Sequence, residues 1–115
     1  MGYESKLFIV ERHRHNNWVY GGIVATFDLC KVPWDHRQIF KVPIDFDLYF
    51  EGNIVTRLDH YEELCCMAKP KEVISALKKL AKESDYRRYK PCIALLKSFD
   101  EEHWGDSIRV VHFGH

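Results

Sequence analysis

The sequence has little of what marks a membrane, secreted or repeat protein. Its 115 residues contain no apolar run long enough to span a bilayer and no N-terminal stretch that resembles a secretory signal. They also contain no repeats, no low-complexity tract and no Ser/Gly-rich linker. We therefore expect a single globular domain over residues 1–115, with no membrane segment and a cytoplasmic location.

The cysteine pattern lacks the marks of a disulfide or zinc framework. The four cysteines, Cys30, Cys65, Cys66 and Cys92, form no C-x-x-C motif, so reduced thiols are the simplest interpretation. Cys92 follows Pro91 near an expected helix start, where a helix dipole can lower a thiol pKa, but it also lies on an apolar stripe, which favours a buried thiol. The chain has no phosphate-binding glycine loop and no G-x-S-x-G element. We assign no catalytic residue and no cofactor.

Net charge is also lacking, because 17 Lys and Arg residues balance 17 Asp and Glu residues. Proteins that bind bulk nucleic acid are usually strongly basic, so the balance disfavours that class without excluding a local patch. Aromatic residues, by contrast, make up 14% of the chain. A surplus of this kind often marks a binding surface. We expect Trp18, Tyr20 and Trp34 to be partly buried.

The first half of the chain predicts four strands. They cover residues 6–10, 18–30, 42–51 and 54–61, with a polar turn over residues 13–17 and a bulge or bend at Gly21–Gly22. In the third strand Val42, Ile44, Phe46 and Leu48 share one face, which we expect to lie against the helices, and Pro43 indicates an edge position. Gly52–Asn53 predicts the tip of a hairpin into the fourth strand.

The second half changes to a helical period. Pro70 opens an amphipathic helix whose apolar stripe includes Val73 and Leu77, and a second helix is expected over residues 86–99, restarting at Pro91. A short helical turn through residue 104 and a final strand over residues 107–113 complete the chain. The predicted fold is α+β: a mainly antiparallel sheet of about five strands, in the order β-β-β-β-α-α-β, with two helices packed on one face.

The outer face of the third strand is the first candidate site. Asp45, Asp47, Tyr49 and Glu51 alternate with the apolar residues, so three carboxylates and one aromatic ring share this face. Such a face can bind a basic protein, supply the paired carboxylates of an enzyme, or be the solvated side of an edge strand.

The second candidate is a basic segment at the start of the second helix. Tyr86, Arg87, Arg88 and Lys90 combine aromatic and cationic side chains, a composition that suits contacts with phosphates and bases. The alternative is an ordinary helix start with tyrosines packed inward and solvated arginines.

Histidines provide the third candidate. His13 and His15 form an H-x-H pair, and His112 and His115 lie near the C-terminus. If the last strand lies beside the first, these imidazoles can meet as ligands of Zn, Ni or Cu. No standard ligand spacing reinforces this pattern, so solvated histidines are the preferred interpretation and no metal is predicted.

Several segments resemble small, uncharacterised proteins encoded in phages and prophages of Gram-positive bacteria. The segments are 2–10 (GYESKLFIV), 27–29 (FDL), 86–91 (YRRYKP), 95–97 (LLK), Phe99–Asp100, Trp104 and 110–115 (VVHFGH). The resemblance implies a genomic setting and carries no functional residue.

Small phage proteins without catalytic motifs often bind and block a host protein. The leading prediction is therefore a non-enzymatic protein-binding module, a phage-encoded inhibitor of a host or defence protein such as a CRISPR component. Its expected partner is a host or phage protein. The alternative is a small nucleic-acid-binding accessory protein, and the third possibility is a metal-dependent enzyme.

Overall fold

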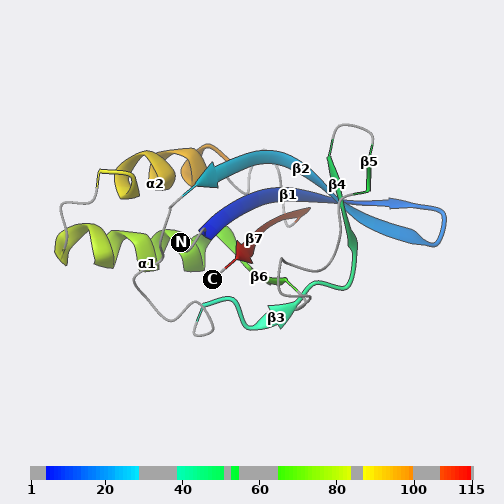
Figure 1. Ribbon diagram of the computed structural model, residues 1–115, viewed down its shortest axis with the longest axis horizontal. Helices are drawn as coiled ribbons and strands as arrows, with labels where there is room; N and C mark the ends of the chain where they lie inside the picture. The colour runs from blue at the N-terminus through cyan, green and yellow to red at the C-terminus, as the bar shows by residue number, and fades with distance from the viewer. Residues whose placement is uncertain are drawn as a thin grey trace.

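The chain folds as a curved sheet with two helices on one side (Figure 1). The computed structural model describes residues 5–28, 39–50, 53–54, 65–83, 87–99 and 107–114. In chain order the elements are β1 (Ser5–His15), β2 (Trp18–Asp28), β3 (Val42–Pro43), β4 (Asp47–Phe50), β5 (Asn53–Ile54), β6 (Cys66–Ala68), α1 (Pro70–Glu83), α2 (Tyr89–Ser98) and β7 (Ile108–Gly114). The predicted α+β class is confirmed. No helix in the described ranges is long and apolar enough to cross a membrane.

The described strands form one sheet of seven, in the order β3-β6-β7-β1-β2-β4-β5. Neighbouring strands are antiparallel except for β2 and β4, which are parallel. The last strand, β7, lies between β1 and β6, so the predicted return of the chain to the first strand is confirmed. The count exceeds the predicted five because the expected third strand is split into two, and because β6 was not predicted.

The β1–β2 hairpin is longer than the sequence indicated. Strand β1 continues through His15 and β2 begins at Trp18, so the turn consists only of Asn16 and Asn17. Asn16 has a φ of 56°, a left-handed conformation that asparagine tolerates better than most residues and that two-residue hairpin turns require. The predicted turn over residues 13–17 is therefore too long.

The irregularity expected at Gly21–Gly22 lies elsewhere. Ile9 pairs with Ala25 and Val10 pairs with Ile23, so the bulge is at the intervening Val24. Gly21 has a different role, since a Cβ at this position would lie 2.5 Å from the ring of Phe46. The glycine allows this buried ring to approach the backbone of β2 closely.

Both helices pack on one face of the sheet. Helix α1 begins at Pro70 as predicted. Helix α2 begins at Tyr89, so Pro91 lies in its first turn, where a missing N–H is tolerated, and the predicted restart at Pro91 is wrong. The core that they share with the sheet contains Leu7, Ile9, Phe40, Ala68, Val73, Leu77, Tyr89, Cys92, Ile93, Leu96, Ile108 and Val110.

A second core covers the opposite face. Its buried members are Val10, Ile44, Phe46, Leu48, Cys65 and Val111. Because β3 lies at one edge of the sheet and β4 near the other, the chain between them must cross this face. The backbone N–H of Ile44 donates to the carbonyl of Cys65 at 3.0 Å during this crossing.

The crossing corrects the predicted orientation of the third strand. Ile44, Phe46 and Leu48 are buried, as their alternation predicted, but they lie on the face away from the helices, and Val42 is 53% exposed. Pro43 does lie in an edge strand, β3. Asn53 pairs with Phe50 within the β4–β5 ladder and is not at a tip. Gly52, most of the expected fourth strand (55–61) and the turn at 100–106 lie outside the described residues.

Candidate protein-binding surface

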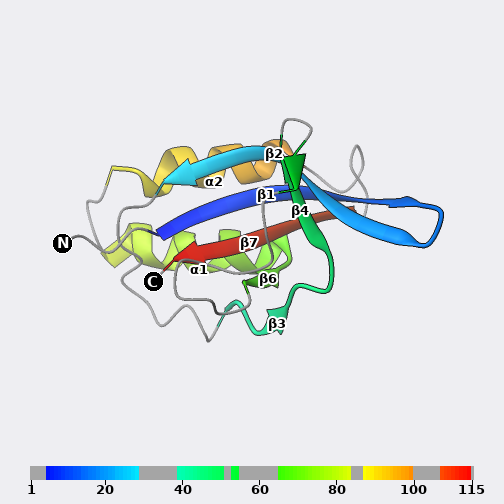
Figure 2. The ribbon, with the colours of Figure 1, turned by 45° about the vertical axis from the view of Figure 1, so that its right-hand side comes forward.

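The end of the β1–β2 hairpin extends beyond the helices. Figure 2 shows α1 and α2 behind one end of the sheet, whereas the hairpin projects past β7 at the other end. The pairing of β1 with β7 stops at Glu11, which lies opposite Ile108. On the other side, β2 pairs with β4 only through residues 20–22. This part of the hairpin thus has one face that the helices do not cover.

The strand register brings chemically related side chains onto this face. His13 pairs with Tyr20 across the hairpin, and Tyr20 in turn pairs with Asp47 of β4. Gly22 pairs with Tyr49 two residues further along the same strands. Paired residues lie on the same face of a sheet, and alternate residues of a strand share that face. Trp18 and Tyr20 therefore join Asp47 and Tyr49.

Three aromatic rings on this face are in mutual contact. The rings of Trp18 and Tyr20 stack with centroids 4.7 Å apart and an interplanar angle of 28°. Tyr49 meets Tyr20 at 5.5 Å and lies edge-on to Trp18 at 6.4 Å and 80°. We name the surface formed by Trp18, Tyr20, Tyr49, His13 and Asp47 the hairpin aromatic surface. Trp18, at 38% exposure, is one of the large hydrophobic side chains left open to solvent.

Polar contacts fix the margins of this surface. The indole Nε1 of Trp18 donates to Oδ2 of Asp47 at 3.4 Å. The imidazole of His13 lies over the ring of Tyr20 with centroids 5.2 Å apart, and its Nε2 is 2.8 Å from Oε1 of Glu11. Aromatic rings held by strands and by neighbouring polar groups lose little conformational entropy when a partner binds them.

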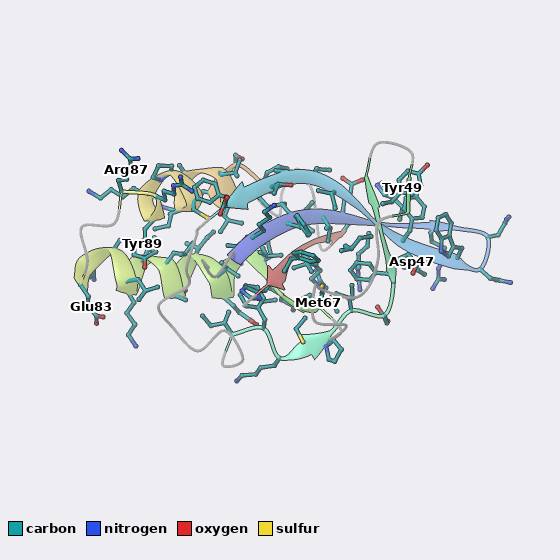
Figure 3. All side chains as sticks on the ribbon, viewed as in Figure 1. Asp47, Tyr49, Met67, Glu83, Arg87 and Tyr89 are labelled. Atoms are coloured by element: carbon teal, nitrogen blue, oxygen red, sulfur yellow. The ribbon has the colours of Figure 1, made fainter. Side chains whose placement is uncertain are left out.

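The residues of the predicted acidic face differ in how exposed they are. Asp45 is exposed, and Asp47 and Tyr49 are half-buried within the hairpin aromatic surface (Figure 3). All three point away from the second core, as the alternation predicted, whereas Glu51 lies outside the described residues. The set therefore contributes two residues to a larger aromatic surface.

The basic segment at the start of α2 lies elsewhere. Figure 3 shows Arg87 at the opposite end of the molecule from Tyr49. Arg88 donates from Nη1 to the carbonyl oxygen of Asp28 at 2.7 Å, which ties α2 to the end of β2. Arg87 and Lys90 are exposed, and Tyr86 lies outside the described residues.

Among the described side chains, the two candidate histidines His13 and His112 do not converge as a metal site would require. His112 is buried against the ring of Phe40 at 5.3 Å and pairs with Leu7. His13 lies six residues further along β1, a separation of about 20 Å in an extended strand. The side chains of His15 and His115 are not among those described. Within the described residues no three His, Cys, Asp or Glu side chains are grouped to hold a metal ion.

The cysteines that the structure describes have the properties of packing residues. None of the three described cysteines, Cys65, Cys66 and Cys92, is part of a disulfide. Burial raises the pKa of Cys92 to about 12, so the helix start does not activate this thiol as a nucleophile. Cys30 lies outside the described residues.

Comparison of the chain with protein-family models, curated proteins and solved structures finds no match. The case for a function accordingly depends on the chain's own residues.

Sequence reasoning missed the importance of Trp18 and Tyr20. Their spacing of two residues after the Asn16–Asn17 turn was a usable signal, because it places both rings on one face of a strand. The sequence carried no signal that β4 would pair in parallel with β2 and add Tyr49 to the same face.

Proposed function

We propose that this protein is a non-enzymatic binding module that contacts a partner protein through the hairpin aromatic surface. The observation that carries the proposal is the group of Trp18, Tyr20 and Tyr49, in mutual contact on a face that the helices leave uncovered. Tryptophan and tyrosine are over-represented among the residues that dominate protein–protein binding energy. A ring that combines apolar area with a polar N–H or O–H suits a surface that alternates between solvent and partner.

The charges beside the rings favour a basic partner. Asp47 and Glu11 flank the cluster, and Asp45 is exposed on the approach to β4. Complementary charge accelerates association and selects among partners. The resemblance to phage-encoded proteins supports a host protein as the partner, because small phage proteins often bind and block host proteins. Defence proteins such as CRISPR components are the first candidates.

Site-specific photocrosslinking tests this proposal directly. A photoreactive amino acid replaces His13, an exposed side chain at the margin of the hairpin aromatic surface, in one variant and Val42, an exposed side chain in the edge strand β3, in a matched control. Both variants keep the Trp18, Tyr20 and Tyr49 rings. We expect a discrete covalent adduct with one host protein from position 13 and none from position 42. The same adducts from both positions, or none from position 13 in a folded variant, would contradict the proposal.

Nucleic-acid binding is a second candidate function. It is supported by the positive charge of the helices, on a surface separate from the hairpin.

A further inference from the structure

Positive charge is concentrated in the helical layer. Across α1 and residues 87–98, eight Lys or Arg side chains accompany two Glu side chains. The whole chain carries equal numbers of basic and acidic residues, so this layer is strongly positive against a neutral average. The basic residues are Lys71, Lys78, Lys79, Lys82, Arg87, Arg88, Lys90 and Lys97, and the acidic ones are Glu72 and Glu83.

The amphipathic pattern of the helices directs these cations outward. Val73 and Leu77 of α1, and Leu96 of α2, point into the core, so the opposite sides face solvent. Lys78, Lys79 and Lys82 are exposed on α1. They line an open groove of about 710 Å³ together with Ile39, Ser75, Ala76, Leu80 and Glu83.

Two of the cations meet across the helix pair. Lys78 of α1 lies near Lys97 of α2, and the positive charge of Lys97 is the largest cause that lowers the pKa of Lys78. Like charges in contact oppose folding, and an anion bound between them would remove that repulsion. The arrangement therefore favours an anionic ligand.

We infer that the exposed side of the helices, comprising Lys78, Lys79, Lys82 and Lys97, binds the phosphate backbone of double-stranded nucleic acid. Neutralised phosphates release counterions, which gives a cluster of lysines appreciable affinity without any base contact. Single-stranded binding needs exposed rings on which bases can stack. Tyr89, the aromatic residue within α2, is buried, so the described helices offer backbone contacts and no stacking platform.

The test measures binding of a fluorescent 20-base-pair DNA duplex by anisotropy between about 20 and 200 mM NaCl, the range in which phosphate contacts dominate. We expect Kd to rise steeply with salt. The Lys78→Glu/Lys97→Glu double variant should bind at least about tenfold more weakly, and the slope of log Kd against log salt should fall by about two, one for each lost phosphate contact.

The control carries the same change in net charge. Lys41 and Lys69 are exposed and lie beside the separate pocket near β3, so Lys41→Glu/Lys69→Glu should leave binding within about twofold of wild type. Lys78→Glu alone creates an opposite-charge pair with Lys97. This single variant should be folded and weakened in binding, which separates loss of the surface from loss of structure.

Three results would overturn the inference. The first is no duplex binding by wild type at about 20 mM NaCl, and the second is equal weakening by both double variants, which would reflect net charge alone. The third is tighter binding of poly-glutamate than of the duplex, which would indicate an acidic protein partner. The Trp18→Ala variant should bind the duplex like wild type, so failure here is distinguishable from failure of the proposed function.

Discussion

The indole of Trp18 donates a hydrogen bond to the carboxylate of Asp47, which lies 29 residues further along the chain. The contact exists because β4 pairs in parallel with β2, with Asp47 opposite Tyr20. It joins an aromatic residue of the β1–β2 hairpin to an acidic residue of β4, a strand that the sequence did not predict to lie beside β2. Asp47 is consequently half-buried, whereas Asp45, two residues earlier, is exposed.

This difference predicts distinct effects of charge reversal at the two aspartates. Asp45→Lys should change the free energy of unfolding by less than about 1 kcal/mol, because it alters an exposed charge. It should slow association with a basic partner and weaken the salt dependence of the association rate. Asp47→Lys should also speed dissociation, because it removes the acceptor of the Trp18 hydrogen bond. Stopped-flow association and surface-based dissociation rates measure both effects, and identical kinetics for the two variants would contradict the account.

Tyr49 should act mainly on dissociation. Its ring contacts both Trp18 and Tyr20, so Tyr49→Ala removes apolar area from the centre of the surface without changing its charge. We expect the dissociation rate to rise by about 10- to 100-fold, with association nearly unchanged. Tyr49→Phe is the control, since it keeps the ring and should stay within about threefold of wild type if ring contact dominates.

Adjacent glycines of β2 should differ in their tolerance of alanine. A Cβ on Gly21 would lie 2.5 and 2.8 Å from atoms of the buried Phe46 ring, whereas a Cβ on Gly22 would lie 3.7 Å from the nearest atom of His13. Gly21→Ala should therefore destabilise the fold by about 1–3 kcal/mol through overpacking. Gly22→Ala should cost less than about 1 kcal/mol. Urea unfolding of both variants checks this, and equal midpoints would contradict the packing of Phe46 on Gly21.

The buried thiol of Cys92 predicts a pH dependence. The unfolded thiol ionises near its ordinary pKa of about 8.5, whereas burial raises the pKa of the folded thiol to about 12. Between these two pKa values the folded protein keeps the thiol proton, whereas the unfolded chain releases it. The stabilisation that the buried thiol provides is therefore complete at neutral pH and decreases as the pH rises above the unfolded pKa.

The destabilisation caused by Cys92→Ala should accordingly be smaller at pH 10 than at pH 7, by about 2 kcal/mol. Native Cys92 should also react with iodoacetamide more slowly than the half-buried Cys66. Denaturant melts at the two pH values give the first comparison and peptide mapping gives the second. A pH-independent effect of the substitution would contradict the burial of this thiol.

The sequence predicted those parts of the fold that depend on local pattern. Alternation identified Ile44, Phe46 and Leu48 as buried, and Pro70 correctly marked the start of α1. Alternation states which side of a strand is apolar, but it does not state which layer that side meets. Residues 42–51 were therefore predicted as one strand against the helices, whereas the chain crosses the opposite face of the sheet between the edge strand β3 and β4.

The candidate site was predictable only in part, for the same reason. Asp47 and Tyr49 were recognisable from their period of two, whereas their neighbours Trp18 and Tyr20 depend on a parallel pairing between distant segments. Such pairings arise from tertiary packing and leave no mark in local sequence. The histidine hypothesis correctly placed β7 beside β1, but the sequence did not give the register of the pairing. That register places His112 opposite Leu7, far from His13.

The most direct test of the central claim is the equilibrium affinity of the partner recovered by crosslinking for the wild type, Trp18→Ala and Val42→Ala. Loss of an anchor ring at the centre of an interface typically costs at least about 2 kcal/mol, so Trp18→Ala should weaken binding by at least about 30-fold. Val42→Ala, an exposed apolar change outside the hairpin aromatic surface, should stay within about twofold of wild type. Wild-type affinity in a folded Trp18→Ala variant would contradict the assignment of this surface as the binding site.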